Sequence, residues 1–115
     1  MADSLDTTQE NDPLKGNLTQ VAVLFADVAG STKLYEALGH AEAKVLIDEA
    51  LIGMKVITQR HRGRVIKTIG DELMCVFPDA ERGFMAATDM QTLANALVVT
   101  KGVKRMIRVG FHAGP

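Results

Sequence analysis

Two aspartates beside apolar segments are the residues best suited to chemistry in this sequence. Asp27 comes directly after the six apolar residues 21–26, a run whose length is typical of a buried strand. Residues 30–32 (Gly-Ser-Thr) then open a helical pattern, and the free N–H groups of a helix N-terminus favour phosphate. A carboxylate beside that turn would repel a phosphate unless a divalent cation lay between them. The alternative interpretation is that Asp27 ends a strand and Ser31 caps a helix.

Asp71 lies between two further apolar segments, residues 64–69 and 73–77, which we interpret as strands. Only three residues separate them, and so short a connection requires a tight antiparallel hairpin. Gly70 can supply the positive φ that such a turn needs. The sequence therefore predicts Asp71 at a hairpin tip.

Apolar periodicity and helix-end residues predict the other elements. Gly39 separates a short helix from a long one, and Gly63 suits the position just after the long helix. Asp79 suits the N-cap of the last helix. We expect strands at residues 21–27, 64–69, 73–77 and 105–113, and helices at 31–38, 40–60 and 80–97. This order, βααββαβ, predicts an α+β, ferredoxin-like fold with a mostly antiparallel sheet and helices on one face.

In this fold the first and third strands form the central pair, so the hairpin tip lies beside the end of the first strand. Asp27 and Asp71 would then come together, and neighbouring carboxylates repel each other unless a cation binds between them. Paired aspartates that share two metal ions are a known solution for phosphoryl and nucleotidyl transfer. We therefore expect a metal site at this end of the sheet.

Two basic residues lie inside predicted strands. Alternation places Lys67 on one face with Val65 and Ile69, where a cation is costly unless it is paired or exposed. Arg108 lies on the face opposite Ile107. Its guanidinium there can pair with a carboxylate or bind a phosphate.

The composition is that of one globular domain of 115 residues. A net charge of -1 and 4% aromatic residues argue against binding to a nucleic acid polymer. The single cysteine, Cys75, cannot form an intrachain disulfide, and we expect a buried thiol in a reducing, cytoplasmic compartment. No apolar run is long enough to span a membrane. Residues 1–17 are polar and are predicted to form a flexible leader or linker.

Three motifs resemble, in order and spacing, the first part of a class III nucleotidyl cyclase catalytic domain, and most closely the bacterial adenylate cyclases. They are LFADVAGSTKL, GRVIKTIGDELMCVF and IRVGFHAGP. The pair FADVAGST and KTIGDELM is specific to this family. The resemblance assigns residues 18–115 to a cyclase catalytic domain whose C-terminal part is missing.

The resemblance also implies roles for individual residues. Asp27, Asp71 and the Val28 carbonyl match the ligands of two divalent cations, Mg²⁺ or Mn²⁺. Lys67 matches the lysine that reads adenine, where guanylate cyclases typically carry glutamate, and Arg108 matches an arginine that contacts the leaving phosphates. The triphosphate-binding turn is matched by the backbone of Ala29, Gly30, Ser31 and Thr32.

The implied reaction is attack of the ribose 3′-oxygen of ATP on its α-phosphorus, giving cyclic AMP and pyrophosphate. Family members work as head-to-tail dimers, in which Lys67 and Asp27 of one chain would serve different sites. This phosphorus–oxygen lyase would act in intracellular signal transduction, with a possible regulatory domain elsewhere in the parent protein.

Two departures from the family pattern are visible. The family's second base-reading residue, its asparagine and its transition-state arginine have no match within the 115 residues, so we expect this chain alone to be a poor cyclase or none. Glu72 follows Asp71 where many members have a small residue, and we expect its side chain to point to solvent.

Three other functions fit the same pattern of elements. A non-catalytic cyclase-homology module could bind nucleotide or a protein partner through the open face of the sheet. A ferredoxin-like nucleic-acid binder would need basic charge and exposed strand aromatics, which are lacking. A diguanylate cyclase palm would carry a GGDEF-type hairpin, whereas this hairpin reads TIGDEL.

Overall fold

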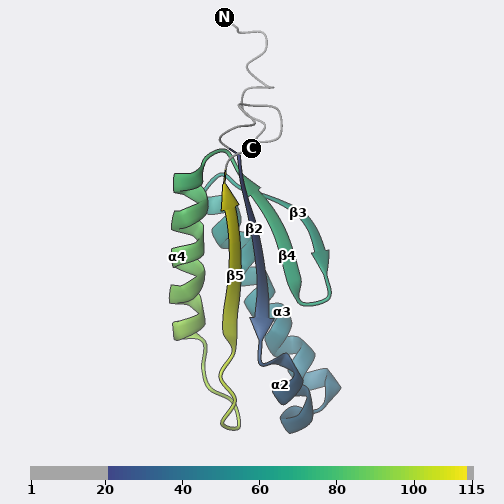
Figure 1. Cartoon of the computed structure of the whole chain (residues 1–115). Coiled ribbons are helices and arrows are strands. Elements are labelled where there is room, and N and C mark those ends of the chain that lie inside the picture. The colour runs from purple at the N-terminus through teal and green to yellow at the C-terminus, as the bar shows by residue number, and fades with distance from the viewer. Residues whose placement is uncertain (1–20, 114–115) are drawn as a thin grey trace, which may run out of the picture.

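The computed structural model describes residues 21–113, which form four strands and three helices. The elements are β2 (Ala22–Ala29), α2 (Ser31–Leu38), α3 (His40–Arg60), β3 (Arg64–Ile69), β4 (Glu72–Phe77), α4 (Ala80–Ala96) and β5 (Met106–Ala113). The strands form one sheet in the order β3-β4-β2-β5, and every neighbouring pair is antiparallel. Helices α3 and α4 lie against one face of this sheet (Figure 1). The predicted βααββαβ fold is confirmed, whereas the predicted leader at 1–17 lies outside the described residues.

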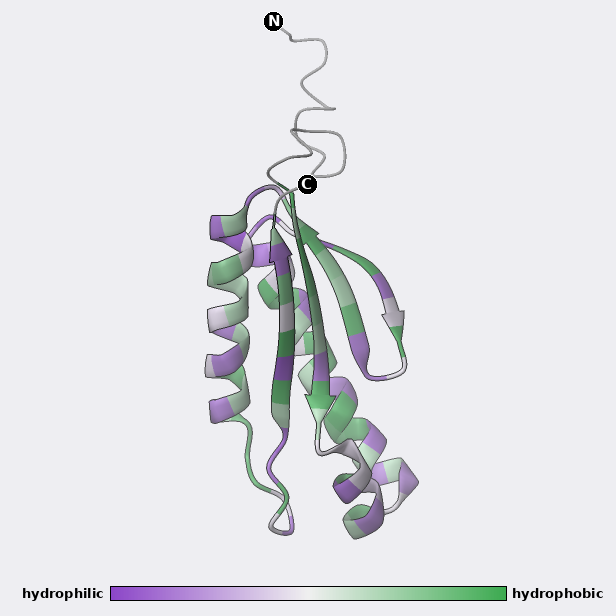
Figure 2. Ribbon diagram, viewed as in Figure 1, coloured by the Kyte–Doolittle hydropathy of each residue, from purple (hydrophilic) through white to green (hydrophobic). Residues whose placement is uncertain are grey.

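The core forms between that face and the two long helices. Strand β2 alternates buried residues with half-exposed or exposed ones, which places one side of the strand under the helices. Figure 2 shows β2 and β4 as predominantly hydrophobic strands, as expected for the two central strands. The buried residues that the helices contribute share a spacing of three or four: Ala43, Ile47, Ala50, Leu51, Met54 and Ile57 from α3, and Ala86, Met90 and Ala94 from α4. The apolar stripes predicted for both helices are therefore the core.

Cys75 is a buried core residue, as predicted. Its sulfur lies 3.4 Å from Oγ1 of Thr58, a buried hydroxyl that also donates a hydrogen bond to the Met54 carbonyl over 2.9 Å. Desolvation by burial raises the pKa of the Cys75 thiol, and the contact with Thr58 offsets part of that rise. The thiol therefore stays protonated and contributes to packing.

The end of α3 differs from the prediction that Gly63 lies just past the helix, because His61 is the C-cap residue and Arg62 follows it. Arg62 takes a left-handed conformation there, with φ of 64°. Gly63 is needed for space, because a Cβ at this position would collide with the Phe77 ring and lie 2.9 Å from a Thr58 methyl group. Asp79 caps α4 as predicted, since its carboxylate accepts a hydrogen bond from the Arg82 backbone over 2.8 Å.

The hairpin between β3 and β4 has a two-residue loop, Gly70 and Asp71, in which Gly70 has φ of 59°. The predicted hairpin tip at Asp71 is confirmed. The predicted face of β3 is partly wrong, because the register shifts between Val65 and Lys67. Val65 pairs with buried Cys75 and packs on the core, whereas Lys67 pairs with Met74 and is exposed. The extra residue of a β-bulge breaks the two-residue alternation on which the prediction rested.

The connection from α4 to β5 is held against α3 by one buried cation. Arg105 is 1% exposed, and its Nη1 donates to Oε1 of Glu49 over 2.5 Å and to the Leu46 carbonyl over 2.9 Å. A further bond from Nη2 reaches the Val98 carbonyl at 3.4 Å. Because β5 begins directly after Arg105, these bonds help to fix where β5 enters the sheet.

Replacing Arg105 with Ala is therefore expected to lower the free energy of unfolding by about 2–4 kcal/mol, since it removes charge-assisted hydrogen bonds and a buried apolar stem. The measurement is urea denaturation followed by circular dichroism. Lys44→Ala is the matched control, because it removes an ion pair with Asp48 that is exposed on both sides and should cost less than about 1 kcal/mol. Equal losses in the two variants would contradict this account of Arg105.

Candidate functional site

Three charged side chains form a row across the neighbouring strands β4, β2 and β5, near the C-terminal end of β2. Strand β2 continues two residues past Asp27, to Ala29, because β5 pairs with it along its whole length. In this register Asp27 is opposite Glu72 on β4 and opposite Arg108 on β5. Directly paired residues project from the same face of a sheet, so all three side chains lie on the face that α3 and α4 leave open.

Arg108 binds Asp27 through two parallel hydrogen bonds. Its Nε lies 3.2 Å from Oδ1 of Asp27, and its Nη2 lies 3.1 Å from Oδ2. The hydrogen bond and the charge of Asp27 raise the pKa of Arg108 above its ordinary value, and the charges of Asp71 and Glu72 raise it further. Arg108 is thus a cation among three carboxylates. Of the two partners expected for Arg108, a carboxylate or a phosphate, the structure shows the carboxylate of Asp27.

A backbone hydrogen bond joins the hairpin tip to the end of β2. The N–H of Val28 donates to the Asp71 carbonyl over 3.2 Å. This contact brings Asp71 beside the residue that follows Asp27, as the fold prediction required. The two residues nevertheless line separate hollows: Asp27 lines one of about 310 Å³ with Arg108, whereas Asp71 lines one of about 380 Å³ beside the stacked rings of Tyr35 and His40.

Glu72 was expected to point to solvent, but it is half-buried and lines the same hollow as Asp27 and Arg108. Phe25, Val109 and Gly110 line the rest of that hollow. The motif alone did not indicate this position. The strand register could have indicated it, since a residue opposite Asp27 on β4 must share its face.

The turn after β2 is built around Gly30, which has φ of 88° and precedes the first residue of α2. A Cβ at Gly30 would lie 3.3 Å from the Lys104 carbonyl oxygen, so both the backbone angle and the space favour glycine. The Gly30 carbonyl accepts a hydrogen bond from the N–H of Leu34 over 3.1 Å. Ser31 does not cap this helix as the alternative interpretation supposed, because Gly30 is the N-cap residue and no side-chain cap bond forms. Ala29, Ser31 and Thr32 flank Gly30 at the same end of the sheet as Asp27.

Lys67 lies apart from this cluster. It is exposed on the edge strand β3 and pairs with Met74, which in turn pairs with Phe25 on β2. Lys67 is therefore two strands from Asp27 and one row further along the open face. The structure does not bring Lys67 to the Asp27 cluster of the same chain.

The oxygen ligands at this end of the sheet fit a hard divalent cation. Asp27, Asp71 and the Val28 carbonyl offer carboxylate and carbonyl oxygens, which Mg²⁺ and Mn²⁺ prefer. Between residues 21 and 113 no three His, Cys, Asp or Glu side chains are grouped as a metal site. The candidate set has two such side chains and a backbone oxygen, and Arg108 engages both oxygens of Asp27.

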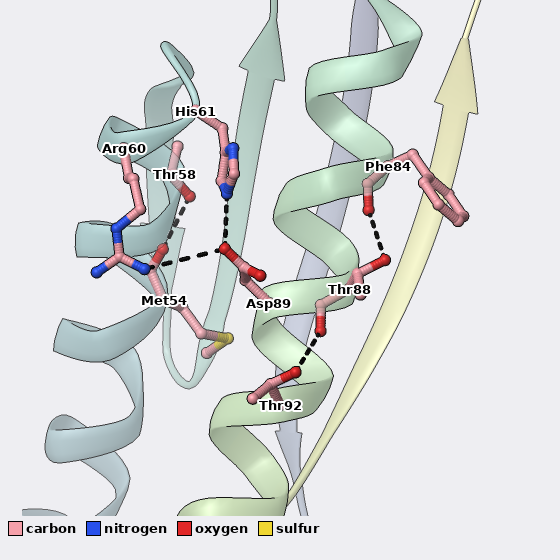
Figure 3. A network of polar contacts seen from close by, with 8 residues as sticks. All are labelled: Met54, Thr58, Arg60, His61, Phe84, Thr88, Asp89 and Thr92. Atoms are coloured by element: carbon pink, nitrogen blue, oxygen red, sulfur yellow. Dashed lines mark hydrogen bonds and ion pairs between the residues drawn. The ribbon is translucent and has the colours of Figure 1, made fainter.

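A second polar cluster lies on the helix side of the sheet. His61 Nε2 is 2.7 Å from Oδ2 of Asp89, and Nη1 of Arg60 is 3.9 Å from the same oxygen (Figure 3). These contacts join the end of α3 to the middle of α4. His61 directly follows the last residue of α3, so its contact with Asp89 lies at the end of that helix.

A protein-family comparison matches residues 15–115 to the adenylate and guanylate cyclase catalytic domain. Several solved structures share the fold. The GTP-bound guanylate cyclase domain of RhGC from Catenaria anguillulae is 20% identical, with a TM-score of 0.73, and the alignment covers 84% of this chain and 57% of that one. The dimeric guanylyl cyclase domain of the RhoGC fusion protein from Blastocladiella emersonii is 22% identical, with a TM-score of 0.73 and coverage of 84% and 58%.

The adenylyl cyclase CyaB from P. aeruginosa is 23% identical, with a TM-score of 0.68, and the alignment covers 83% of this chain and 56% of that one. The chain thus spans somewhat over half the length of these solved domains. Both adenylyl and guanylyl cyclases are among them. Across residues 21–113, no helix is long and apolar enough to cross a membrane.

Gly30→Ala is expected to destabilise the fold by about 1–2 kcal/mol, because alanine pays a steric cost at positive φ. Gly110→Ala is the matched control. A Cβ at Gly110 would meet nothing within 4 Å, and its effect should stay within about 0.5 kcal/mol. Urea denaturation of both variants measures the difference. A Gly30 variant as stable as the Gly110 variant would rule out a constrained turn.

Proposed function

The chain belongs to the adenylate and guanylate cyclase catalytic domain family, and on that premise we propose that it binds the metal ions and triphosphate of ATP for conversion to cyclic AMP and pyrophosphate. The observation that carries this proposal is the hydrogen bond from Val28 to the hairpin tip at Asp71. It sets two carboxylate-bearing residues and a glycine turn at one end of the sheet, where a cation and a phosphate chain could be bound together.

The proposed roles follow from the chemistry of each group. Asp27, Asp71 and the Val28 carbonyl would bind two divalent cations, Mg²⁺ or Mn²⁺. Such ions, when bound, polarise the α-phosphate and lower the pKa of the attacking 3′-hydroxyl. The turn formed by residues 29–32 would donate backbone N–H groups to the phosphates, and Arg108 would contact the leaving phosphates with its planar guanidinium.

ATP is proposed over GTP because of Lys67. By the family resemblance, this position reads the base, and guanylate cyclases typically carry glutamate there. Lys67 is exposed on the edge strand, two strands from Asp27. This separation supports a head-to-tail homodimer, in which Lys67 of one chain would reach the nucleotide held by Asp27 of the other.

The proposal predicts that the chain binds ATP in the presence of Mn²⁺. The double variant Asp27→Ala/Asp71→Ala should abolish this binding, because each substitution removes a carboxylate ligand. Isothermal titration calorimetry measures it directly. Binding is measured rather than turnover because these 115 residues span somewhat over half of the solved domains. Circular dichroism checks that each variant is folded.

The matched control is Glu42→Ala/Glu81→Ala, which removes two exposed carboxylates from the first turns of α3 and α4. This control should bind as the native chain does. Unchanged binding in the Asp27/Asp71 variant would contradict the proposed site. It would favour the alternative, a cyclase-homology module that binds nucleotide elsewhere on its surface.

A further inference from the structure

The ion pair between Arg108 and Asp27 occupies the group that the proposed function assigns to a metal ion. Both carboxylate oxygens of Asp27 accept a hydrogen bond from the guanidinium, at 3.1 and 3.2 Å. A divalent cation binds the same oxygens, and it carries the same sign of charge as Arg108. The two cannot occupy Asp27 together without strong repulsion.

Arg108 is free to leave this position. Its side chain is 75% exposed, whereas that of Asp27 is 24% exposed. Among the residues that the structure describes, Asp27 is the hydrogen-bond partner of its guanidinium. Glu72 and Asp71 act on it through charge alone. Exposed ion pairs are weak, so rotation of the Arg108 side chain away from Asp27 costs little.

We propose that Arg108 blocks metal binding at Asp27 and is exchanged for a divalent cation when a triphosphate binds. This inference rests on the proposed metal-binding role of Asp27. Without nucleotide, the guanidinium neutralises Asp27 and opposes capture of a free metal ion. A triphosphate offers Arg108 oxygens of equal geometry, because guanidinium groups bind phosphate and carboxylate in the same bidentate way. Phosphate capture would then release Asp27 for the cation.

The consequence is coupled binding. If a triphosphate removes the guanidinium from Asp27, it raises the affinity of Asp27 for the metal, and the metal raises the affinity for triphosphate by the same factor. The chain would therefore bind a metal–nucleotide complex in preference to the free ion. Arg108 acts here as a positioning residue for the cation site, in addition to its proposed contact with phosphate.

The test is the affinity of the nucleotide-free chain for Mn²⁺ alone, measured by electron paramagnetic resonance of the unbound ion. Arg108→Gln is expected to bind Mn²⁺ at least about 5-fold more tightly than the native chain, since a competing ion pair and a repelling charge are both removed. Adding Asp27→Asn to this variant should abolish the gain. Arg60→Gln is the matched control, because it removes one positive charge at the C-terminal end of α3, on the helix side of the sheet. It should leave the Mn²⁺ affinity unchanged.

The outcomes separate this inference from the proposed function. If Mn²⁺ binding depends on Asp27 but Arg108→Gln does not tighten it, Arg108 does not block metal binding, although the metal role of Asp27 stands. If Arg108→Gln and Arg60→Gln tighten binding equally, the gain comes from the loss of one positive charge anywhere on the chain. A blocking role of Arg108 is then again excluded. If Asp27→Asn changes Mn²⁺ affinity neither in the native chain nor in the Arg108→Gln variant, both the blocking role of Arg108 and the metal role of Asp27 are wrong.

Discussion

The antiparallel pairing of β2 between β4 and β5 is the constraint on which the site depends. Because β2 is hydrogen-bonded along both edges, the position of Asp27 in the chain determines which residues flank it, namely Glu72 and Arg108. The same pairing carries the β3–β4 hairpin to the end of β2, where Val28 bonds to Asp71. A shift of one residue in either ladder would turn one of these side chains into the core.

Charge balance at this end of the sheet follows from that register. Asp27, Asp71 and Glu72 bring three negative charges near one guanidinium, and Arg108 is the cation that engages Asp27 in the described structure. A site with spare negative charge favours divalent cations, and a site with a movable arginine favours phosphate. The proposed function needs both properties at one end of the sheet, where Asp27 and Arg108 lie on paired strands and Asp71 lies in the adjacent hairpin loop.

The sequence predicted the fold and much of the local geometry, because the signals were strong and local. Gly70 between two apolar segments predicted the hairpin and placed Asp71 at its tip. Other features depended on tertiary contacts. The bulge beside Val65 arises in strand pairing, and the need for glycine at position 63 arises from the Phe77 ring that packs there. The partner of Arg108 was left open between carboxylate and phosphate, because alternation gives the face of a residue but not its opposite neighbour.

The most direct test of the central claim, that the ends of β2 and of the β3–β4 hairpin form one metal–phosphate site, is paramagnetic line broadening. Amide signals of the ¹⁵N-labelled chain would be recorded with ATP and substoichiometric Mn²⁺. The account predicts broadening confined to residues 27–32, 70–72 and the neighbourhood of Arg108, and its loss in Asp27→Asn/Asp71→Asn. Broadening centred on the helix side, around His61 and Asp89, or retained in that variant, would contradict it.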